Sequence, residues 1–270
     1  MSDIVLTAGV RSNLLNLQQT SSLMTTVQDQ LATGKKVNSA LDNPISYFTS
    51  QSLTNRANSL SSLLDSMSNA FQTIQAANNG ISSITKLVQS AQALVSQAQQ
   101  TADTSVRAGL ATQFNAVLTQ IDQLAGDSGF NGINLLANNS LTVTLNESGT
   151  SSVTVSGVAD STTALSLNNA TNNFAGAADL TTASSALTAA LTTLQSQAQS
   201  FGTNLSTVQI RQDFTKSMVD TLQTGSDNLT LADSNQAGAD LLALQTRQQL
   251  STTALSLASQ ASQSVLRLFG

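Results

Sequence analysis

Residues 53–98, LTNRANSLSSLLDSMSNAFQTIQAANNGISSITKLVQSAQALVSQA, decide the fold that this chain predicts. Their apolar positions alternate in steps of four and three, with one shift of a residue: Leu53, Ala57, Leu60, Leu64, Met67, Phe71, Ile74, then Ala77, Ile81, Ile84, Val88, Ala91, Val95 and Ala98. Such heptad spacing places one apolar stripe along a helix. A helix over 44–100 would be about 85 Å long at about 1.5 Å per residue. We therefore expect a rod that packs against partner helices.

Similar spacing predicts four further helices. One precedes the rod, over 3–33, and one follows it, over 104–124, and should fold back along it. The second half carries a helix over 181–222 and, after a break at 224–226, a final helix. The stripes of the first, third and last helices are Val10, Leu14, Leu17, Ser21, Met24, Gln28 and Leu31; Val106, Leu110, Phe114, Val117 and Ile121; and Leu250, Ala254, Leu257, Ala261, Ser264 and Leu268.

Turn residues mark where these helices begin and end. The first helix should stop at Gly34, since glycine readily takes the left-handed position after a helix. The rod should begin with Asn43 as its N-cap and Pro44 at the first helical position, where the missing N–H of proline does no harm. This chain contains one proline, which leaves long helices unbroken.

The middle of the chain follows a different pattern. Residues 141–145 and 153–155 alternate with period two around a turn-rich connection at 146–150, which predicts a β-hairpin. Residues 164–167 could add a strand. The surroundings, over 125–178, are rich in Gly, Asn, Ser and Thr and are expected to form loops. The fold class is therefore mainly α: long antiparallel rods from both halves of the chain, with a small β insert.

Composition excludes several classes of function. Charged residues make up 9% of the chain and its net charge is −5, so no basic surface is available to neutralise nucleic-acid phosphates. The chain has no cysteine and no histidine, which excludes disulfides and thiolate sites and removes the commonest metal ligand. No apolar stretch is long enough to span a membrane. The first ten residues lack the pattern of a cleavable signal peptide.

Carboxylates were the remaining candidates for acid–base or metal chemistry. None of them has a convergent set of partners in the sequence, so we expect solvated or interface charges and neither a catalytic site, a metal site nor a cofactor. The loop at 127–132 lacks the spacing and closing Glu of a calcium loop. The candidates are Asp122, Asp127, Asp227, Asp233 and Asp240.

Several segments resemble bacterial flagellin. LATGKKVNSALDNP (31–44) resembles the connection between the family's first two helices, and GFNGINLL (129–136) resembles the loop that closes its N-terminal half. LADSNQA (231–237) and residues 241–269, ending in SVLRLF, resemble the C-terminal half. The resemblance covers nearly all of the chain outside 138–175. The small size of the chain resembles that of the flagellins of alphaproteobacteria.

This resemblance implies a division of the chain into the two inner flagellin domains, D0 and D1, without large outer domains. Residues 1–33 and 226–270 would form D0, the inner coiled coil of a filament. Residues 34–137 and 178–225 would form D1, and 138–177 would be a short variable insert that faces outward. Export would proceed unfolded through the flagellar apparatus, to an extracellular filament.

The resemblance also assigns residues and partners. The loop motifs are Gly34, Asn38, Asp42, Asn43 and Pro44 in the first connection, and Phe130, Asn131 and Gly132 in the second. The residues expected to drive polymerisation are Val10, Leu14, Leu17, Met24, Leu31, Leu250, Ala254, Leu257, Ala261 and Leu268. Partners would be further copies of the chain or other flagellins, the export apparatus and a chaperone, and the hook-associated and cap proteins, with neither nucleic acid nor membrane.

Two further expectations concern recognition and folding. Flagellins sensed by the innate Toll-like receptor carry an arginine-rich stretch where this chain has residues 79–89, with Lys86 as the one basic residue, so strong recognition is not expected. The polar Ser21 and Gln28 in the first stripe predict that the terminal helices order fully only in the polymer, where burial between subunits offsets the ordering entropy.

Two other functions compete with the filament subunit. One is the hook–filament junction protein of the same superfamily, which shares the terminal helices. The other is a secreted helical adhesin, which would fold and bind its target without polymerising.

Overall fold

The computed structural model describes residues 8–269, apart from the side chains of Ser262 and residues 265–269. The predicted first helix therefore has its start, residues 3–7, outside the described residues. The elements are α1 (Ala8–Thr33), α2 (Pro44–Gln100), α3 (Thr104–Asp127), β1 (Leu141–Thr144), β2 (Ser152–Val155), a 3₁₀ turn η1 (Thr171–Phe174), α4 (Ala177–Thr230) and α5 (Ser234–Phe269). Among residues 8–269, no helix combines the length and the apolar character needed to cross a bilayer.

The chain divides into two compact units. The terminal unit consists of residues 1–55 and 221–270, and the rod unit of residues 56–220. Helices α2 and α4 contribute to both, whereas α1 and α5 belong to the terminal unit, and α3 and the β insert belong to the rod unit.

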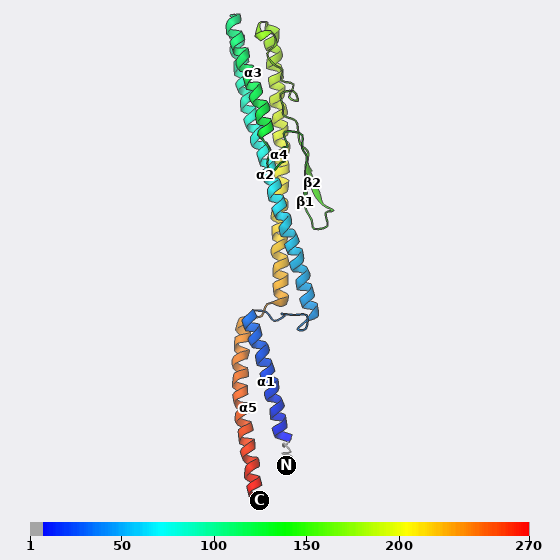
Figure 1. The fold of residues 1–270 in the computed structure, drawn as a ribbon, viewed down its shortest axis with the longest axis vertical. Coiled ribbons are helices and arrows are strands. Elements are labelled where there is room, and N and C mark those ends of the chain that lie inside the picture. The colour runs from blue at the N-terminus through cyan, green and yellow to red at the C-terminus, as the bar shows by residue number, and fades with distance from the viewer. Residues whose placement is uncertain (1–7, 270) are drawn as a thin grey trace. The chain divides into compact units, whose positions relative to one another are not determined.

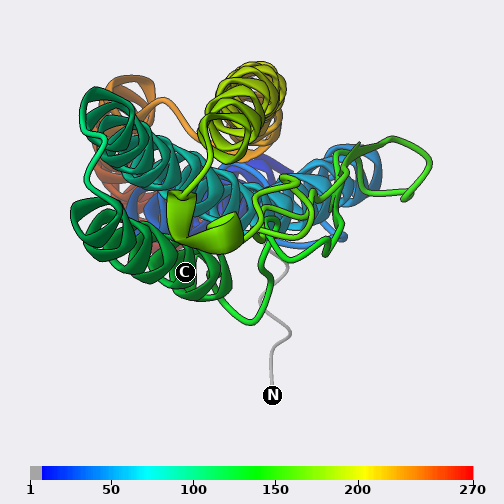
Figure 2. The same ribbon diagram turned by 90° about the horizontal axis from the view of Figure 1, so that it is seen from above.

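The rod unit is built on the heptad stripe of α2. Helices α2, α3 and α4 lie side by side, with α3 and α4 antiparallel to α2 (Figures 1 and 2). Small and branched side chains let the helices approach closely, and three phenylalanines fill the wider gaps. The predicted mainly α fold with antiparallel rods is confirmed. The fully buried members of this core include Met67, Ile74, Ile81, Ile84, Phe114, Ile121, Leu187 and Phe201.

One core position predicted at the start of α3 is wrong. Val106 was expected in the stripe of this helix, but its side chain is 49% exposed. Arg107 takes the inward direction instead, and its Nε donates to the carbonyls of Ala98 and Thr101 at 3.1 and 2.8 Å. These carbonyls lie at the end of α2, where a helix lacks its own donors. Capping α2 therefore turns Val106 toward solvent.

Helix α4 does not break where the sequence suggested. It continues through Gly225 and ends at Thr230, and α5 begins after the N-cap Asp233, which accepts from two backbone N–H groups. A Cβ at Gly225 would lie 3.4 Å from the Leu53 side chain of α2, an ordinary van der Waals contact, and the residue keeps a helical backbone. The buried hydroxyl of Ser226 is satisfied by Ser50 at 2.7 Å.

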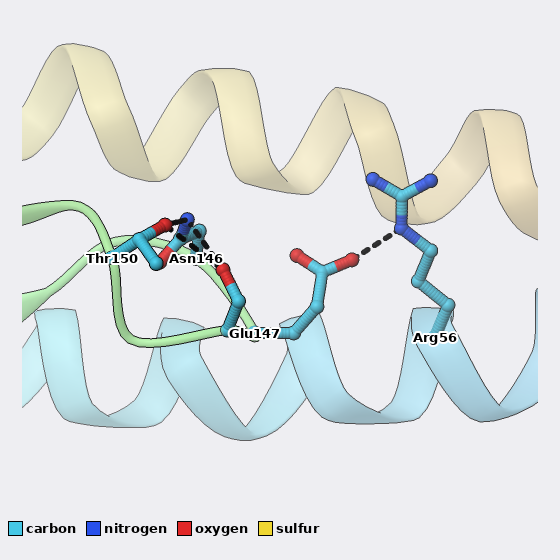
Figure 3. Close-up of polar contacts among 5 residues, drawn as sticks. Arg56, Asn146, Glu147 and Thr150 are labelled. Atoms are coloured by element: carbon cyan, nitrogen blue, oxygen red, sulfur yellow. Dashed lines mark hydrogen bonds and ion pairs between the residues drawn. The ribbon is translucent and has the colours of Figure 1, made fainter.

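The β insert is a two-stranded antiparallel hairpin, as predicted, in which Leu141 pairs with Val155 and Val143 with Val153. Val143 and Val155 are buried in the core of the rod unit. An ion pair between Arg56 of α2 and Glu147 ties the tip of the hairpin to the helix, and Asn146 donates to Thr150 within the tip (Figure 3).

A third strand at 164–167 was wrongly predicted. Leu165 and Leu167 are both buried, but they belong to a turn in which the N–H of Leu167 donates to the carbonyl of Thr162 at 2.8 Å. Ser166 lies between them with φ +56°, in the left-handed region. The turn buries alternate residues and so imitates the period of a strand.

Hydroxyl groups decorate the helices in place of charges. Thr25, Thr182 and Thr253, among many others, donate to the carbonyl four residues earlier in the same helix, at 2.9–3.1 Å. Such bonds satisfy the hydroxyl without any partner outside the helix. The helices therefore keep a polar surface although charged residues make up only 9% of the chain.

The loop between α1 and α2 is held rigidly. Gly34 has φ +68°, as the left-handed position after α1 predicted, and Asn43 caps α2 by accepting from the N–H of Ser46 at 3.0 Å. Asp42 accepts from the N–H groups of Asn38 and Ser39, both at 2.9 Å, and these backbone donors lower the pKa of its carboxyl. The loop is also anchored to the start of the α4–α5 connection, since the N–H of Ala232 donates to the carbonyl of Gly34.

We expect Gly34→Ala to destabilise the terminal unit by about 1–2 kcal/mol, because an alanine is strained at this φ while nothing lies within 4 Å of its Cβ. Chemical unfolding followed by circular dichroism measures the change. The matched control is Gly238→Ala in α5, where a Cβ also meets nothing and alanine is the better helix former. If both variants change stability alike, the left-handed requirement at Gly34 is wrong.

One carboxyl in the rod unit is fully buried. Asp160 has no exposed surface, and among the described residues neither of its carboxylate oxygens has a hydrogen-bond partner. Burial raises the pKa of Asp160 from 3.8 to about 6. The folded protein therefore holds this proton over a pH range in which the unfolded chain has lost it.

This burial predicts a pH-dependent stability. The contribution of the protonated Asp160 is fully present below pH 3.8 and is lost as the pH rises through about 6, a total of about 3 kcal/mol. Asp160→Asn removes the titration, so its stability relative to the natural protein should grow between pH 4 and pH 7. Urea unfolding of the monomer at several pH values tests this, with the exposed Asp65→Asn as control. A constant difference for Asp160→Asn across this range contradicts the prediction.

Candidate assembly surface

Helices α1 and α5 pack against each other, antiparallel, along most of their length (Figure 1). The covered positions of α5 follow a regular heptad spacing, and those of α1 follow the same steps of three and four. They are Val10, Asn13, Leu17, Thr20, Met24 and Val27 on α1, and Ala237, Leu241, Leu244, Gln248, Ser251, Leu255 and Ala258 on α5.

This pairing differs from the stripe expected for α1. Val10, Leu17 and Met24 lie on it, but Asn13, Thr20 and Val27 replace Leu14, Ser21 and Gln28 at the alternate positions. Thr20 lines the same hollow between α1 and α5 as the polar Ser251, and its hydroxyl is satisfied by the carbonyl of Asn16 at 2.8 Å. Leu14 and Leu31 are left 39% and 36% exposed.

The stripe expected for α5 lies outside the pairing altogether. Leu250 and Leu257 are 66% and 61% exposed, and Ala254 and Ala261 are exposed with them. At about 100° per residue, this outer stripe lies about a third of a turn around α5 from the residues that face α1. Leu268 lies in α5 beyond the described side chains. Helix α5 thus carries two apolar stripes, one covered by α1 and one open.

Apolar residues also surround α1. Leu15 and Leu23, 59% and 52% exposed, lie on different sides of the helix from Leu14. A helix with apolar side chains on all sides is typically buried on all sides. Leu23 also lines a groove of about 280 Å³ between α1 and α5, together with the apolar Val27, Ala243 and Leu244 and the charged Asp240 and Arg247.

Exposed apolar residues are concentrated in the terminal unit. Of fifteen large apolar side chains exposed among the described residues, eleven lie there, although it is the smaller unit. The four in the rod unit are Val106, Phe130, Ile210 and Phe214. Such a concentration of exposed large apolar side chains is typical of a surface that another protein covers.

The second loop motif lies elsewhere, in the rod unit. Phe130 and Ile133 exchange two backbone hydrogen bonds at 2.9 and 3.0 Å across a tight turn, with Asn131 at φ +50° and Gly132 at φ +81°. Positive φ at both central residues defines the turn that asparagine and glycine favour. The motif therefore shapes a turn within the rod unit.

The candidate carboxylates have structural roles or none. Asp233 caps α5, and Asp122 accepts from the backbone and hydroxyl of Thr162 at 2.7 and 2.9 Å. Among residues 8–269, no group of three or more potential metal ligands comes together. The open apolar faces of α1 and α5 are therefore the candidate functional site, a surface for contact with another protein.

Sequence reasoning missed the inward residues of α5, such as Leu241, Leu244 and Leu255. The signal was present, because they follow steps of three and four as regularly as the outer stripe does. Helix α5 carries two apolar stripes of the same spacing, and its sequence alone does not show which of them faces the partner helix.

Comparison with known proteins supports one family. The sequence model for the bacterial flagellin N-terminal helical region matches residues 7–140. Flagellins FljK, FljM and FljO of Caulobacter vibrioides are 32%, 31% and 30% identical to this chain, with 100% of the chain and 99% of each relative covered. A crystal structure of Bacillus cereus flagellin aligns with 54% of this chain and 86% of its own, at 18% identity and a TM-score of 0.48. Whole-length similarity to named flagellins, on a chain of paired helices with open apolar faces, shows that this chain belongs to the bacterial flagellin family.

Proposed function

We propose that this flagellin polymerises through the open faces of its terminal helices, the outer stripe of α5 and the exposed leucines of α1. As a member of its family, the protein is a structural, non-enzymatic subunit of the flagellar filament. The observation that carries the proposal is the second apolar stripe of α5, which α1 leaves uncovered.

Burial of this surface would stabilise a polymer appreciably. Fully burying a leucine contributes about 1.5–3 kcal/mol, and Leu14, Leu250 and Leu257 are all at least one third exposed in the single chain. Because the same residues recur in every copy, each added subunit gains this burial again. The groove beside Leu23 is large enough for an apolar side chain of a neighbouring copy.

The domain division follows as part of the proposal. Residues 1–33 and 226–270 would form the inner coiled coil, D0, and residues 34–137 and 178–225 would form D1. The insert over 138–177 would face outward. Its hairpin is short and packs on the rod unit, which supports a filament without large outer domains.

The remaining partners are also part of the proposal. The protein would be exported through the flagellar apparatus with the help of a chaperone, and would contact hook-associated and cap proteins in an extracellular filament. Strong recognition by the Toll-like receptor is not expected, since Lys86 is the one basic residue in 79–89. No observation favours the junction protein or the adhesin over the filament subunit.

We expect Leu257→Asp to abolish polymerisation while leaving the monomer folded. The side chain is 61% exposed in the single chain, so a charge is tolerated there, but it would be buried without a partner in the filament. Sulfate-induced or seeded assembly, followed by sedimentation and electron microscopy, measures the effect. The control is Ser256→Asp, which adds the same charge to α5 on neither apolar stripe.

Two outcomes would contradict the proposal. Normal filaments from Leu257→Asp would remove the outer stripe of α5 from the interface. Failure of the natural protein to polymerise under all seeding and salting conditions would overturn the filament function itself.

The expectation that the terminal helices order fully only in the polymer stays a prediction. The polar residues on the covered faces of α1 and α5, Asn13, Thr20, Gln248 and Ser251, support it because they bury little apolar surface. Amide hydrogen exchange should be fast in α1 and α5 of the monomer, slow in α2–α4, and slow throughout in the filament. Equal protection of both regions in the monomer would refute it.

A further inference from the structure

The end of the α1–α2 loop and the start of α2 present exposed apolar side chains that do not belong to the pairing of α1 with α5. Leu41 is 96% exposed, Ile45 is 80% exposed and Phe48 is 62% exposed, and all three follow one another at spacings of four and three. Tyr47 stacks edge-on against Phe48 at 5.5 Å between ring centroids. Leu41, Ile45 and Phe48, which we call the loop patch, lie in the turn before α2 and in its first two turns.

The loop patch is held in place. Asp42 accepts from two backbone N–H groups and from the hydroxyl of Ser39, Val37 is buried beneath the loop, and the N–H of Lys36 donates to the carbonyl of Thr230 at 2.7 Å. Fixing a surface before it binds removes part of the ordering entropy that binding would otherwise cost. A leucine displayed almost wholly to solvent by so well-anchored a loop is suited to insertion into a partner.

An open helical polymer needs two different surfaces on each copy. A contact between identical patches closes into a dimer, whereas a head-to-tail contact between unlike patches continues from copy to copy. The complement of the loop patch must therefore lie elsewhere on the same chain.

The rod unit offers one such complement. Ile210 and Phe214, the α4 patch, are 65% and 57% exposed and share a face of α4 because they are four residues apart. The other two exposed large apolar residues described in that unit, Val106 and Phe130, belong to α3 and to the turn after it, so neither extends the patch along α4.

Charge supports the same pairing. Asp42, the one charged residue within 37–55, directly follows Leu41, so the charge nearest the loop patch in the sequence is negative, whereas Lys35, Lys36 and Arg56 lie further along the chain. Exposed Arg211 and Lys216 flank the α4 patch, with Asp213 as the one acidic residue among them. Opposite charges around an apolar contact favour the correct register.

We propose that the loop patch of one copy docks on the α4 patch of a neighbouring copy, as a second contact between subunits outside the terminal helices. This inference rests on the proposed function, because it presupposes a polymer. It adds a contact made by Leu41, Ile45 and Phe48 on one copy and by Ile210 and Phe214 on the next.

Introduced cysteines test the pairing directly, because the natural chain has none. Chains carrying Ile45→Cys and size-tagged chains carrying Ile210→Cys are polymerised together and oxidised, so that any mixed disulfide joins two copies. We expect mixed dimers in filaments and not in unpolymerised mixtures, since a disulfide requires Cβ atoms about 3.5–4.5 Å apart. The control pairs Ile45→Cys with Val106→Cys, which is exposed but belongs to neither patch.

A second variant measures how much the contact contributes. Replacing Leu41, Ile45 and Phe48 together by serine should leave the monomer folded and raise the critical concentration for polymerisation about tenfold or more. The control replaces Val106 and Phe130 by serine and should polymerise as the natural protein does.

These experiments separate the two proposals. If natural chains polymerise but the serine variant has an unchanged critical concentration, or if the mixed dimer is no more abundant than in the control pair, the docking of the two patches is overturned and the role of α1 and α5 stands. If natural chains never polymerise, the proposed function fails first.

Discussion

The seam of α2 against α3 and α4 is the contact on which the rest of the molecule depends. It runs from Met67 to Ala98 with every heptad position buried except Phe71, which is partly covered. Because nearly all of these residues are aliphatic, the three helices can lie close together over a great length. The β insert, the aromatic contact between Phe114 and Phe174 and the turn at Asn131 all pack on or around this seam. Without it, none of them has a surface to fold upon.

The terminal unit follows the opposite principle. Its α1–α5 seam is short of apolar bulk and contains Asn13, Thr20, Gln248 and Ser251, while leucines remain on the outside. A single chain thus buries most of the large apolar side chains of its rod unit but leaves many of those in its terminal unit exposed. That asymmetry fits a subunit whose rod folds first and whose ends are completed by neighbours.

The sequence was sufficient for the long helices, because heptad spacing over many turns has few alternatives. It also located Gly34, Asn43 and the hairpin, where local backbone chemistry decides the outcome. It failed where distant contacts are made: Arg107 capping α2 displaced Val106, and α4 continues through Gly225 to place Ser226 against Ser50 of α2. The choice between two stripes on α5 likewise depended on α1, and the left-handed Ser166 gave a turn the burial period of a strand.

The hydroxyl groups that bond within their own helices have a consequence for hydration. The hydroxyls of Thr25, Thr182 and Thr253 donate to a carbonyl four residues earlier and so need no water molecule as acceptor. The chain also has few charged groups that contact would dehydrate. When such surfaces meet, little bound water must be stripped from strongly hydrated groups, so the free energy of contact is eroded less by dehydration. Cohesion between such copies should accordingly depend weakly on ionic strength, because few of the touching groups are ions.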